Sequence, residues 1–434
     1  MLRAPAAILA LFVLAGCSVP GVGGPQAAVL EIGVDLPLSG AEGRVATPAL
    51  NGVRFYVQQH PTVDGFAINL VVKDDSLSGV PEAPLGAANV QAFAADPRVM
   101  AMIGPFDSSV ARAEIPVANQ ASLAMVSPAT SSPCLTKPDY VPAALSPSHV
   151  AVSCKQAGLP APGDLRPTGV NNYFRLAATD DLQGPAAADY AVKTLHLLRV
   201  ATISDHEAYG QALAGGFATR FGALGGSIVG RLDLDPSAAV DATGFLNRMK
   251  ANGAQAIYFG GVTANKGCVI RAEMAGVFAP GEATPFLGGD GIADDPACTQ
   301  DAATNVAGIY ATVPIVDTSS VGSAEPVISA FKSAFPRPQD YGAYTVIAYD
   351  AIAVVYDALD RAIKAAGGQA PPRGNVISQL SITYAFDGAI GVFGFDAAGD
   401  STRQVITLYE PQPAAPRGPW TRVASVDYTG ALPY

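Results

Sequence analysis

The sequence has little positive charge, with 26 Lys and Arg residues against 37 Asp and Glu residues and a formal net charge of −11. No basic cluster interrupts this acidic balance, so the chain lacks the electrostatic footprint of a nucleic-acid-binding protein. Its 434 residues, 49% of them hydrophobic, are enough to bury a substantial core. We therefore expect a globular protein of two ordinary domains or one very large one, with no nucleic acid as a partner.

Common catalytic and metal-binding motifs are also missing. The sequence contains no G-x-S-x-G, no H-E-x-x-H and no phosphate-binding loop, which argues against the enzymes that these motifs define. Its four histidines are scattered and no two cysteines have C-x-x-C spacing, which argues against zinc. We expect no cofactor, no metal and no catalysis. The alternative is a hydrolase that uses Ser108 or the segment around His206.

The N-terminal segment is typical of an exported protein. Arg3 precedes the apolar run "APAAILALFVLAG", which at 13 residues is too short to span a bilayer but suits a signal peptide. The junction "LAGC" resembles the bacterial lipobox, in which the cysteine after the cleavage site carries lipid. We therefore expect a signal peptide at residues 1–16, a lipid anchor on Cys17 and a flexible tether at 17–28. The alternative is an ordinary cysteine in an ordinary signal peptide.

Four more cysteines follow, an even number in an exported and therefore oxidising setting. We expect them to form the disulfides Cys134–Cys154 and Cys268–Cys298. The first pair would close the base of residues 131–169, a proline-rich segment without helical or strand periodicity. We interpret that segment as a long surface excursion.

Short β-branched runs alternate with amphipathic helical stretches in two similar series, at residues 29–128 and 199–290. Such alternation predicts parallel βαβ units, and two series predict two similar α/β lobes. Thr47 and Pro48 predict a helix start, because a proline at the first helical position loses no hydrogen bond. The apolar helix expected at about 341–367 is too hydrophobic to lie alone on a surface, so it should cover a sheet.

Nine short motifs carry a family resemblance. With them the sequence resembles the periplasmic binding proteins for branched-chain amino acids, which are the solute receptors of ABC importers and are also called type I periplasmic binding proteins or extracellular ligand-binding receptors. The resemblance extends over nearly all of residues 29–410. The motifs are "LPLSG" (36–40), "LNG" (50–52), "KDD" (73–75), "IGPFDSS" (103–109), "VSPATSS" (126–132), "FRLAATDDLQGPAAADY" (174–190), "AYG" (208–210), "YFGG" (258–261) and "FLGGDG" (286–291).

The resemblance implies two Rossmann-like α/β lobes, each a parallel-core sheet flanked by helices, with a small ligand caught between them. Three hinge crossings would join the lobes near Ala178, Val313 and Val392. On this division, lobe 1 comprises residues 29–178 plus 313–392, and lobe 2 comprises residues 179–312 plus 393–434.

Hydroxyl groups at two strand ends of lobe 1 are expected to hold a ligand carboxylate. Ser108 and Ser109 follow a predicted strand and open a helix, so hydroxyls and free backbone N–H groups meet at the carboxyl end of the sheet. The resemblance gives the same task to a threonine at position 131. Here Ser131 follows Ala129 and Thr130, so the hydroxyls of residues 130 and 131 are both candidates. Helix capping alone is the alternative for the first two serines.

A lone carboxylate, Asp290, ends the strand of "FLGGDG", where glycines let backbone and ligand approach closely. The resemblance implies that Asp290 binds a ligand ammonium group and that Tyr209 lines the cleft; a turn aspartate and a packing tyrosine are the alternatives. Asp181 either lies at the cleft rim or favours the next helix N-terminus. Val45 and Val262 replace two family aromatic residues, so the pocket differs and the identity of the ligand stays open.

These expectations imply a function. The resemblance describes a lipid-anchored solute-binding protein on the extracytoplasmic face of a bacterial membrane. Such a protein captures an amino acid or a similar small polar ligand by hinge closure and delivers it to an ABC permease and ATPase complex. The alternative is a ligand sensor of the same fold that signals to a membrane partner.

Overall fold

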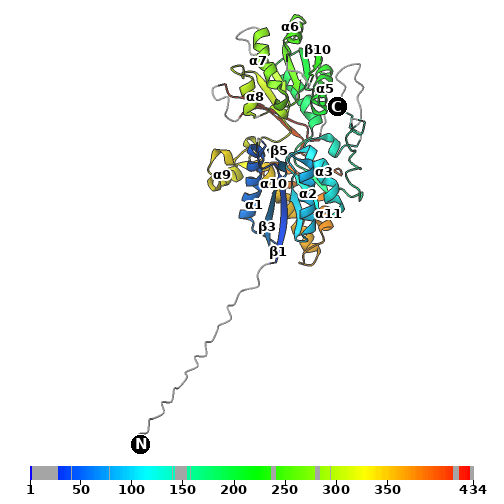
Figure 1. Ribbon diagram of the computed structural model, residues 1–434, viewed down its shortest axis with the longest axis vertical. Helices are drawn as coiled ribbons and strands as arrows, with labels where there is room; N and C mark the ends of the chain where they lie inside the picture. The colour runs from blue at the N-terminus through cyan, green and yellow to red at the C-terminus, as the bar shows by residue number, and fades with distance from the viewer. Residues whose placement is uncertain are drawn as a thin grey trace.

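The computed structural model consists of two α/β lobes stacked end to end (Figure 1). It describes Met1 and residues 28–430 apart from 41, 78, 139, 142–153, 157, 236–240, 279–283, 294 and 414–419. The predicted signal peptide and the predicted lipid anchor at Cys17 lie outside the described residues. Among the helices that are described, none is long and apolar enough to cross a membrane.

Lobe 1 is built on a sheet whose neighbouring strands run parallel, apart from the edge strand β2. The run "VLEIGVDL" forms its central strand and is buried at all but its first position, as expected for a parallel sheet covered on both faces. In spatial order the strands are β2 (Thr62–Val63), β3 (Phe66–Asp74), β1 (Val29–Leu36), β6 (Val99–Ile103), β7 (Ala124–Ser127) and β8 (Tyr173–Arg175).

Two hydrophobic cores cover the two faces of this sheet. One core contains residues of α1, α10 and α11, and the other contains residues of α2 and α3. The long apolar helix that we predicted is α10, which is buried along most of its length and contacts β6 and β7. The helices are α1 (Gly43–Gln59), α2 (Ala83–Ala95), α3 (Ser108–Gln120), α9 (Ala324–Ala334), α10 (Thr345–Ala365) and α11 (Arg373–Ser381).

The predicted helix start at Thr47 and Pro48 is wrong. The helix begins at Gly43, so Pro48 lies inside it. A proline at this position cannot donate to the carbonyl of Arg44 one turn earlier. Arg44 is an exposed residue of the first turn, and the helix continues through the proline.

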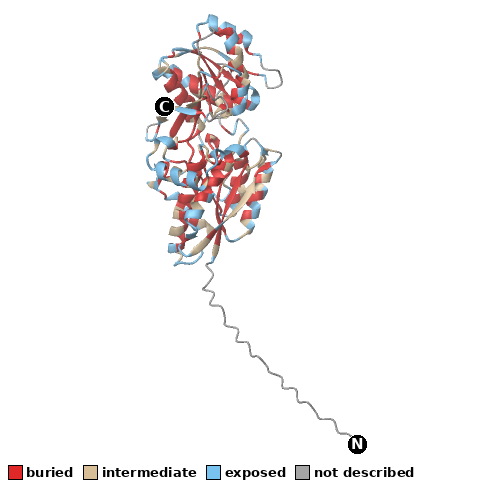
Figure 2. Ribbon diagram, turned by 90° about the vertical axis from the view of Figure 1, so that its left-hand side faces the viewer, coloured by how far each residue is buried: buried red, intermediate tan, exposed pale blue. Residues whose placement is uncertain are grey.

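Lobe 2 is built on a second sheet, in which five parallel strands are followed by two antiparallel ones. Figure 2 shows buried residues concentrated in the interior of each lobe and exposed residues on the outer helices. The strands in spatial order are β10 (Ser227–Asp233), β9 (Arg199–Ser204), β11 (Ala256–Gly260), β12 (Phe286–Gly288), β13 (Ile309–Val313), β16 (Val405–Glu410) and β17 (Thr421–Asp427). The helices are α4 (Gln183–Lys193), α5 (Ala208–Ala223), α6 (Thr243–Ala251), α7 (Gly267–Val277) and α8 (Pro296–Asp301).

The chain crosses between the lobes at places where distant segments meet. The backbone N–H of Ala178 donates to the carbonyl of Pro314 at 2.8 Å, which joins the first two expected crossings. Val392 lies within β15 (Gly391–Phe393), which pairs with β14 (Phe386–Gly388). Because Phe395 still packs in the core of lobe 1, we propose to place the third crossing after this phenylalanine and keep the remaining lobe boundaries as predicted.

Both predicted disulfides are confirmed. Cys134 and Cys154 are bonded with their Cα atoms 5.7 Å apart, and Cys268 and Cys298 are bonded with their Cα atoms 5.1 Å apart. The second disulfide fastens α7 to α8 inside a hydrophobic core of lobe 2. Because all four sulfur atoms are in disulfides, none of these cysteines is a zinc ligand.

Candidate functional site

Asp290 lies where β12 ends, and side chains from distant parts of lobe 2 surround it. The Tyr209 hydroxyl donates to its carboxylate, and the Gln183 amide donates to the same oxygen at 2.8 Å. The backbone N–H of Asp290 donates back to Gln183 Oε1 at 3.1 Å, and that of Gly291 donates to the Tyr209 hydroxyl at 3.1 Å. The carboxylate is therefore fixed in orientation by a closed hydrogen-bond network.

Glycine before Asp290 makes this network possible. A Cβ atom on Gly289 would lie 2.4 Å from a methyl group of Leu213 and 2.9 Å from the Tyr209 hydroxyl. Such distances are closer than van der Waals contact allows, so a larger residue would push the tyrosine away. The glycines of "FLGGDG" thus allow the close approach that we expected, although the first group admitted is a tyrosine of the same lobe.

Asp180 is a second carboxylate of the site, and the sequence analysis missed it. The Gln183 amide that donates to Asp290 also donates to Asp180 Oδ1 at 2.9 Å, so one amide group holds two carboxylates. Burial, followed by the charge of Asp290, raises the pKa of Asp180 to about 7. Burial likewise raises the pKa of Asp290. A cation placed between the two carboxyl groups would favour their charged forms and so lower both pKa values.

Asp181, which the sequence analysis singled out, lies apart from Asp290. Its carboxylate forms an ion pair with Lys137 at 2.7 Å, and the same ammonium donates to Thr179 at 2.9 Å. The motif "TDDLQG" contains two adjacent aspartates, and only the first reaches the network around Gln183. Adjacent residues in a 3-10 turn, here Asp180–Leu182, point in different directions, which is why sequence alone did not separate them.

Ser131 connects lobe 1 to this network. Its backbone carbonyl accepts from the N–H of Asp180 at 2.9 Å, and its side chain offsets part of the rise in the pKa of Asp180. Thr130 points elsewhere, because its hydroxyl donates to Ser127 Oγ at 2.7 Å and shares a hydrogen bond with the Tyr173 hydroxyl.

The remaining predicted residues of that loop are held in lobe 1. Ala129 is buried there with its N–H donating to Ser127 Oγ at 3.2 Å. Of the two hydroxyls left open by the sequence, that of Ser131 is therefore the one at the junction of the lobes.

Ser108 and Ser109 have different surroundings at the start of α3. Asp107 is the N-cap of this helix, and its carboxylate accepts from both the N–H and the hydroxyl of Ser109 at 2.7 and 2.6 Å. Ser108 accepts from the N–H of Ser132 at 3.3 Å, which places it beside the loop that contains Ser131. Neither serine is the N-cap, so capping alone does not account for them.

Aromatic side chains from lobe 1 lie against the site. Tyr344 packs edge-on against Phe106, with ring centroids 4.7 Å apart. Burial raises the pKa of Tyr344 well above its usual value, and the charges of Asp290 and Asp180 raise it further, so its hydroxyl lies within electrostatic reach of both carboxylates. Neither aromatic residue was predicted. Phe106 lies in the motif "IGPFDSS", two residues before Ser108, and could have been found from it, whereas no motif of the sequence analysis contains Tyr344.

The two valines that replace family aromatics differ in position. Val45 is 40% exposed on the first turn of α1. Val262 is half-buried and lies beside Gly291. A Cβ atom added to Gly291 would lie 2.8 Å from a methyl group of Val262. Val262 therefore borders the loop of Asp290. Val45 is exposed, and it is smaller than the aromatic residue that it replaces in the family.

Acidic side chains also surround the site at a greater distance. Desolvation raises the pKa of Glu42, and the charges of Asp107 and Asp295 raise it further. Glu42 and Asp107 belong to lobe 1, whereas Asp295 caps α8 in lobe 2. The charges of Asp290, Asp180 and Glu42 all act on Tyr344, so acidic groups from both lobes contribute negative potential there, which favours a ligand that carries positive charge.

Two similar α/β lobes, joined by several crossings and contributing polar groups to one site, define a two-lobed binding protein. The chain belongs to the family of periplasmic binding proteins, whose pattern matches residues 29–415. The family resemblance expected from the nine motifs is therefore confirmed, as is the fold class. Members of this family are binding proteins of the extracytoplasmic space.

Individual relatives agree with this assignment. The chain is 25% identical over 404 residues to the Leu/Ile/Val-binding protein homolog 2 of Brucella abortus, with 91% of this chain and 93% of the relative covered. Among solved structures, a leucine-binding protein of Thermotoga maritima has a TM-score of 0.68 and 24% identity, with 92% of this chain and 99% of that chain covered. A solute-binding protein of Rhodopseudomonas palustris in complex with p-hydroxybenzoic acid has a TM-score of 0.67 and 17% identity, with 92% and 98% covered.

Proposed function

We propose that the protein is the solute receptor of an ABC importer and that it captures an amino acid or a similar small molecule with an ammonium and a carboxylate group. The observation that carries this proposal is the pair Asp180 and Asp290, held by one Gln183 amide at the junction of the lobes. A ligand ammonium placed there would gain charge-assisted hydrogen bonds, which are about twice as strong as neutral ones.

The charges of the site favour one of two ligand classes suggested by the relatives. Some relatives are named for leucine, isoleucine and valine, and one structure contains p-hydroxybenzoic acid. Both classes have a carboxylate, but only an amino acid adds a cation. Burial raises the pKa of Asp180, Asp290 and Glu42, and neighbouring acids raise those of Asp180 and Glu42 further. A simple anion would therefore increase the repulsion, and an amino acid would reduce it.

The carboxylate end of the ligand would bind to lobe 1. The oxygen of Ser108 accepts a hydrogen bond from Ser132, so its own proton is available for a ligand carboxylate. The N–H that Ser108 accepts from belongs to the loop of Ser131, so the hydroxyls of Ser108 and Ser131 come from neighbouring segments of lobe 1. We keep Tyr209, Ser109, Ala129 and Val262 as neighbours of the ligand, with Tyr209 orienting Asp290.

A ligand that touches both lobes favours their closure. Its ammonium would contact lobe 2 at Asp290, and its carboxylate would contact lobe 1 at Ser108, so only the closed form makes both contacts. The closed form is then stabilised by the difference in binding free energy between the two states. A permease and ATPase complex in the membrane can respond to that shape.

The first test replaces Asp290 with alanine and measures binding by calorimetry, starting from a screen of amino acids. Loss of a hydrogen bond to a charged group costs roughly 1.5–3 kcal/mol, and an ammonium left without its partner costs more. We expect affinity to fall by about tenfold to several hundredfold. The same substitution should matter much less for a ligand analogue that lacks the amino group. Equal losses for both ligands, at an unchanged melting temperature, would contradict the assignment of Asp290 to the ammonium.

A second test concerns the proposed lipid anchor. Cys17 directly follows the apolar run in "LAGC", so Cys17→Ser should remove the lipid attachment point and release the protein from membranes. One acyl chain gives only weak binding, and stable anchoring needs more than one. The measurement is the partition of wild type and variant between membrane and soluble fractions. Retention of the Cys17→Ser protein in the membrane fraction would contradict a lipid anchor at this residue.

A further inference from the structure

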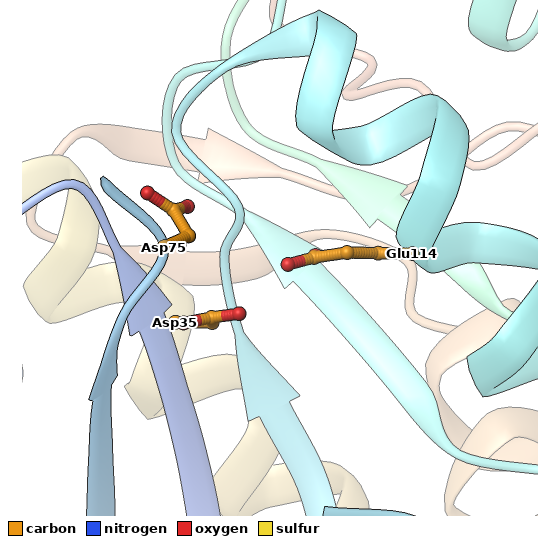
Figure 3. Close-up of side chains that lie close together, drawn as sticks. All are labelled: Asp35, Asp75 and Glu114. Atoms are coloured by element: carbon orange, nitrogen blue, oxygen red, sulfur yellow. The ribbon is translucent and has the colours of Figure 1, made fainter. Parts of the chain in front are cut away.

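Three carboxyl side chains meet inside lobe 1, and among the described residues no hydrogen bond joins them to the network around Asp290. Figure 3 shows Asp35 at the end of β1 and Glu114 on α3 pointing toward each other, with Asp75 at the end of β3 beside them. One oxygen from each carboxyl group lies within 4.8 Å of the others. All three side chains are fully buried.

The surrounding protein leaves most of these oxygen atoms without a hydrogen bond. Among the described residues, both oxygens of Asp75, both of Glu114 and Asp35 Oδ2 have no donor. The second oxygen of Asp35 accepts from the Asn89 amide at 2.9 Å. Buried polar groups are nearly always paired, so five orphaned oxygens on three neighbouring carboxyl groups indicate a partner of a different kind.

Within the described ranges of the chain, no cationic side chain forms an ion pair with the cluster. None of the ion pairs found in the described part of the chain includes Asp35, Asp75 or Glu114. The positive charge of Lys73 acts on Asp35 and opposes the rise in its pKa. The Lys73 ammonium itself lies over the ring of Phe93, 6.0 Å from the ring centroid. Buried charges without partners are costly, so the carboxyl groups require either protons or a bound cation.

The backbone around the cluster preserves room for its oxygen atoms. Gly86 of α2 faces Glu114, and a Cβ atom at this position would lie 2.7 Å from Glu114 Oε1. The glycine therefore lets the glutamate extend between α2 and β1. The motif "KDD", one of those that carry the family resemblance, supplies Asp75 and is otherwise unused by the ligand site.

We propose that Asp35, Asp75 and Glu114 form a structural binding site for a divalent cation, and that this cation is calcium. Carboxylate oxygens are the ligands that hard cations prefer. At Ca–O distances of about 2.3–2.6 Å, ligands on opposite sides of the ion are up to about 5 Å apart, so oxygens within 4.8 Å can share one calcium ion. Magnesium, with distances of about 2.0–2.1 Å, requires a tighter set. The ion ties the ends of β1 and β3 to α3.

The experiment titrates calcium chloride into the purified, chelator-treated protein and follows heat and melting temperature. We expect one ion per chain, and at a hundredfold excess over the dissociation constant the ratio of folded to unfolded protein rises about a hundredfold. Asp75→Asn and the nearly isosteric Glu114→Gln each remove one charged ligand and weaken calcium binding by at least about tenfold. Circular dichroism shows whether each variant is folded. If one of the two variants does not fold, Asp35→Asn is measured in its place.

The control is Asp64→Asn in the same lobe. Asp64 is exposed and has φ 44° in the turn before β3, a conformation that asparagine also adopts, so calcium binding is unchanged. Three outcomes overturn the proposal: no calcium binding at millimolar concentration, equal binding by the cluster variants and wild type, or tighter binding of magnesium than of calcium. The first outcome together with a higher melting temperature for Asp75→Asn assigns the cluster to shared protons instead.

Discussion

At the scale of single residues, Tyr209 does more than line the site. Its hydroxyl donates to Asp290 and accepts from the N–H of Gly291, so it fixes both the carboxylate and the turn that carries it. Tyr209→Phe should leave the ring in place and free the carboxylate to move. We expect affinity for the amino-acid ligand to fall by about tenfold, which corresponds to the loss of one hydrogen bond to a charged group.

Tyr258 is the matched control for this substitution. It is fully buried in lobe 2, stacks on Phe217 with ring centroids 4.2 Å apart, and its hydroxyl has no hydrogen-bond partner among the described residues. Tyr258→Phe removes a hydroxyl that bonds to nothing, so affinity should stay within about twofold of wild type. Similar losses in the two variants, measured by calorimetry, would show that Tyr209 has no special role.

At the scale of elements, α1 and α10 touch through their backbones. A Cβ atom on Gly52 would lie 2.0 Å from the carbonyl oxygen of Thr345 and 3.3 Å from the N of Tyr349. Gly52→Ala must therefore push the helices apart, and overpacking of this kind costs about 1–3 kcal/mol or more. We expect denaturant unfolding to show that loss of stability.

Gly222 provides the control at the same scale. It lies near the end of α5 and does not adopt a positive φ, and a methyl group added to it would meet no atom within 4 Å beyond its chain neighbours and the backbone of its own helix. Gly222→Ala should be neutral or stabilising by up to about 1 kcal/mol, because alanine restricts the unfolded chain. A Gly52→Ala protein as stable as Gly222→Ala would contradict the close contact between α1 and α10.

At the scale of the whole molecule, ligand binding and stability should respond to pH in opposite directions. Asp180 has a pKa of about 7 in the folded protein because of burial and the charge of Asp290. Below that pH its carboxyl group is mostly neutral, and at pH 6 only about one chain in ten is charged. Affinity for an ammonium ligand should therefore fall about tenfold between pH 8 and pH 6, and Asp180→Asn should remove most of this slope.

The ligand-free protein should show the reverse trend. Burial raises the pKa of both Asp180 and Asp350 from 3.8 to about 7. A raised carboxyl pKa contributes stability that is fully present below pH 4 and is lost as the pH rises through 7. The contribution of these two groups to the free energy of unfolding should therefore decrease from pH 5 to pH 8. Affinity and stability that rise together over this range, by calorimetry and thermal melts, would contradict both assignments.

Much of the fold could be predicted from the sequence because its causes are local. Alternating apolar runs and amphipathic stretches predicted both sheets, and the hydrophobicity of residues 341–367 predicted a buried helix. The presence of two disulfides was expected from an even count of cysteines in an exported chain, and the structure confirms the predicted pairs, 134 with 154 and 268 with 298. The start of α1 was misplaced, since the chain tolerates Pro48 inside a helix where the sequence signal favours it at the beginning.

The position of Asp290 at a strand end was determined by the sequence alone, because glycine spacing and strand periodicity are properties of a short segment. Its partners were decided by the tertiary structure. Gln183 is 107 residues away and Tyr209 is 81 residues away, and only the packing of α4 and α5 against the sheet brings them together. Tertiary packing also places Asp180, and not Asp181, in the network around Gln183. It likewise brings Asp35, Asp75 and Glu114 together, since the direction of a side chain depends on the turn or helix that carries it.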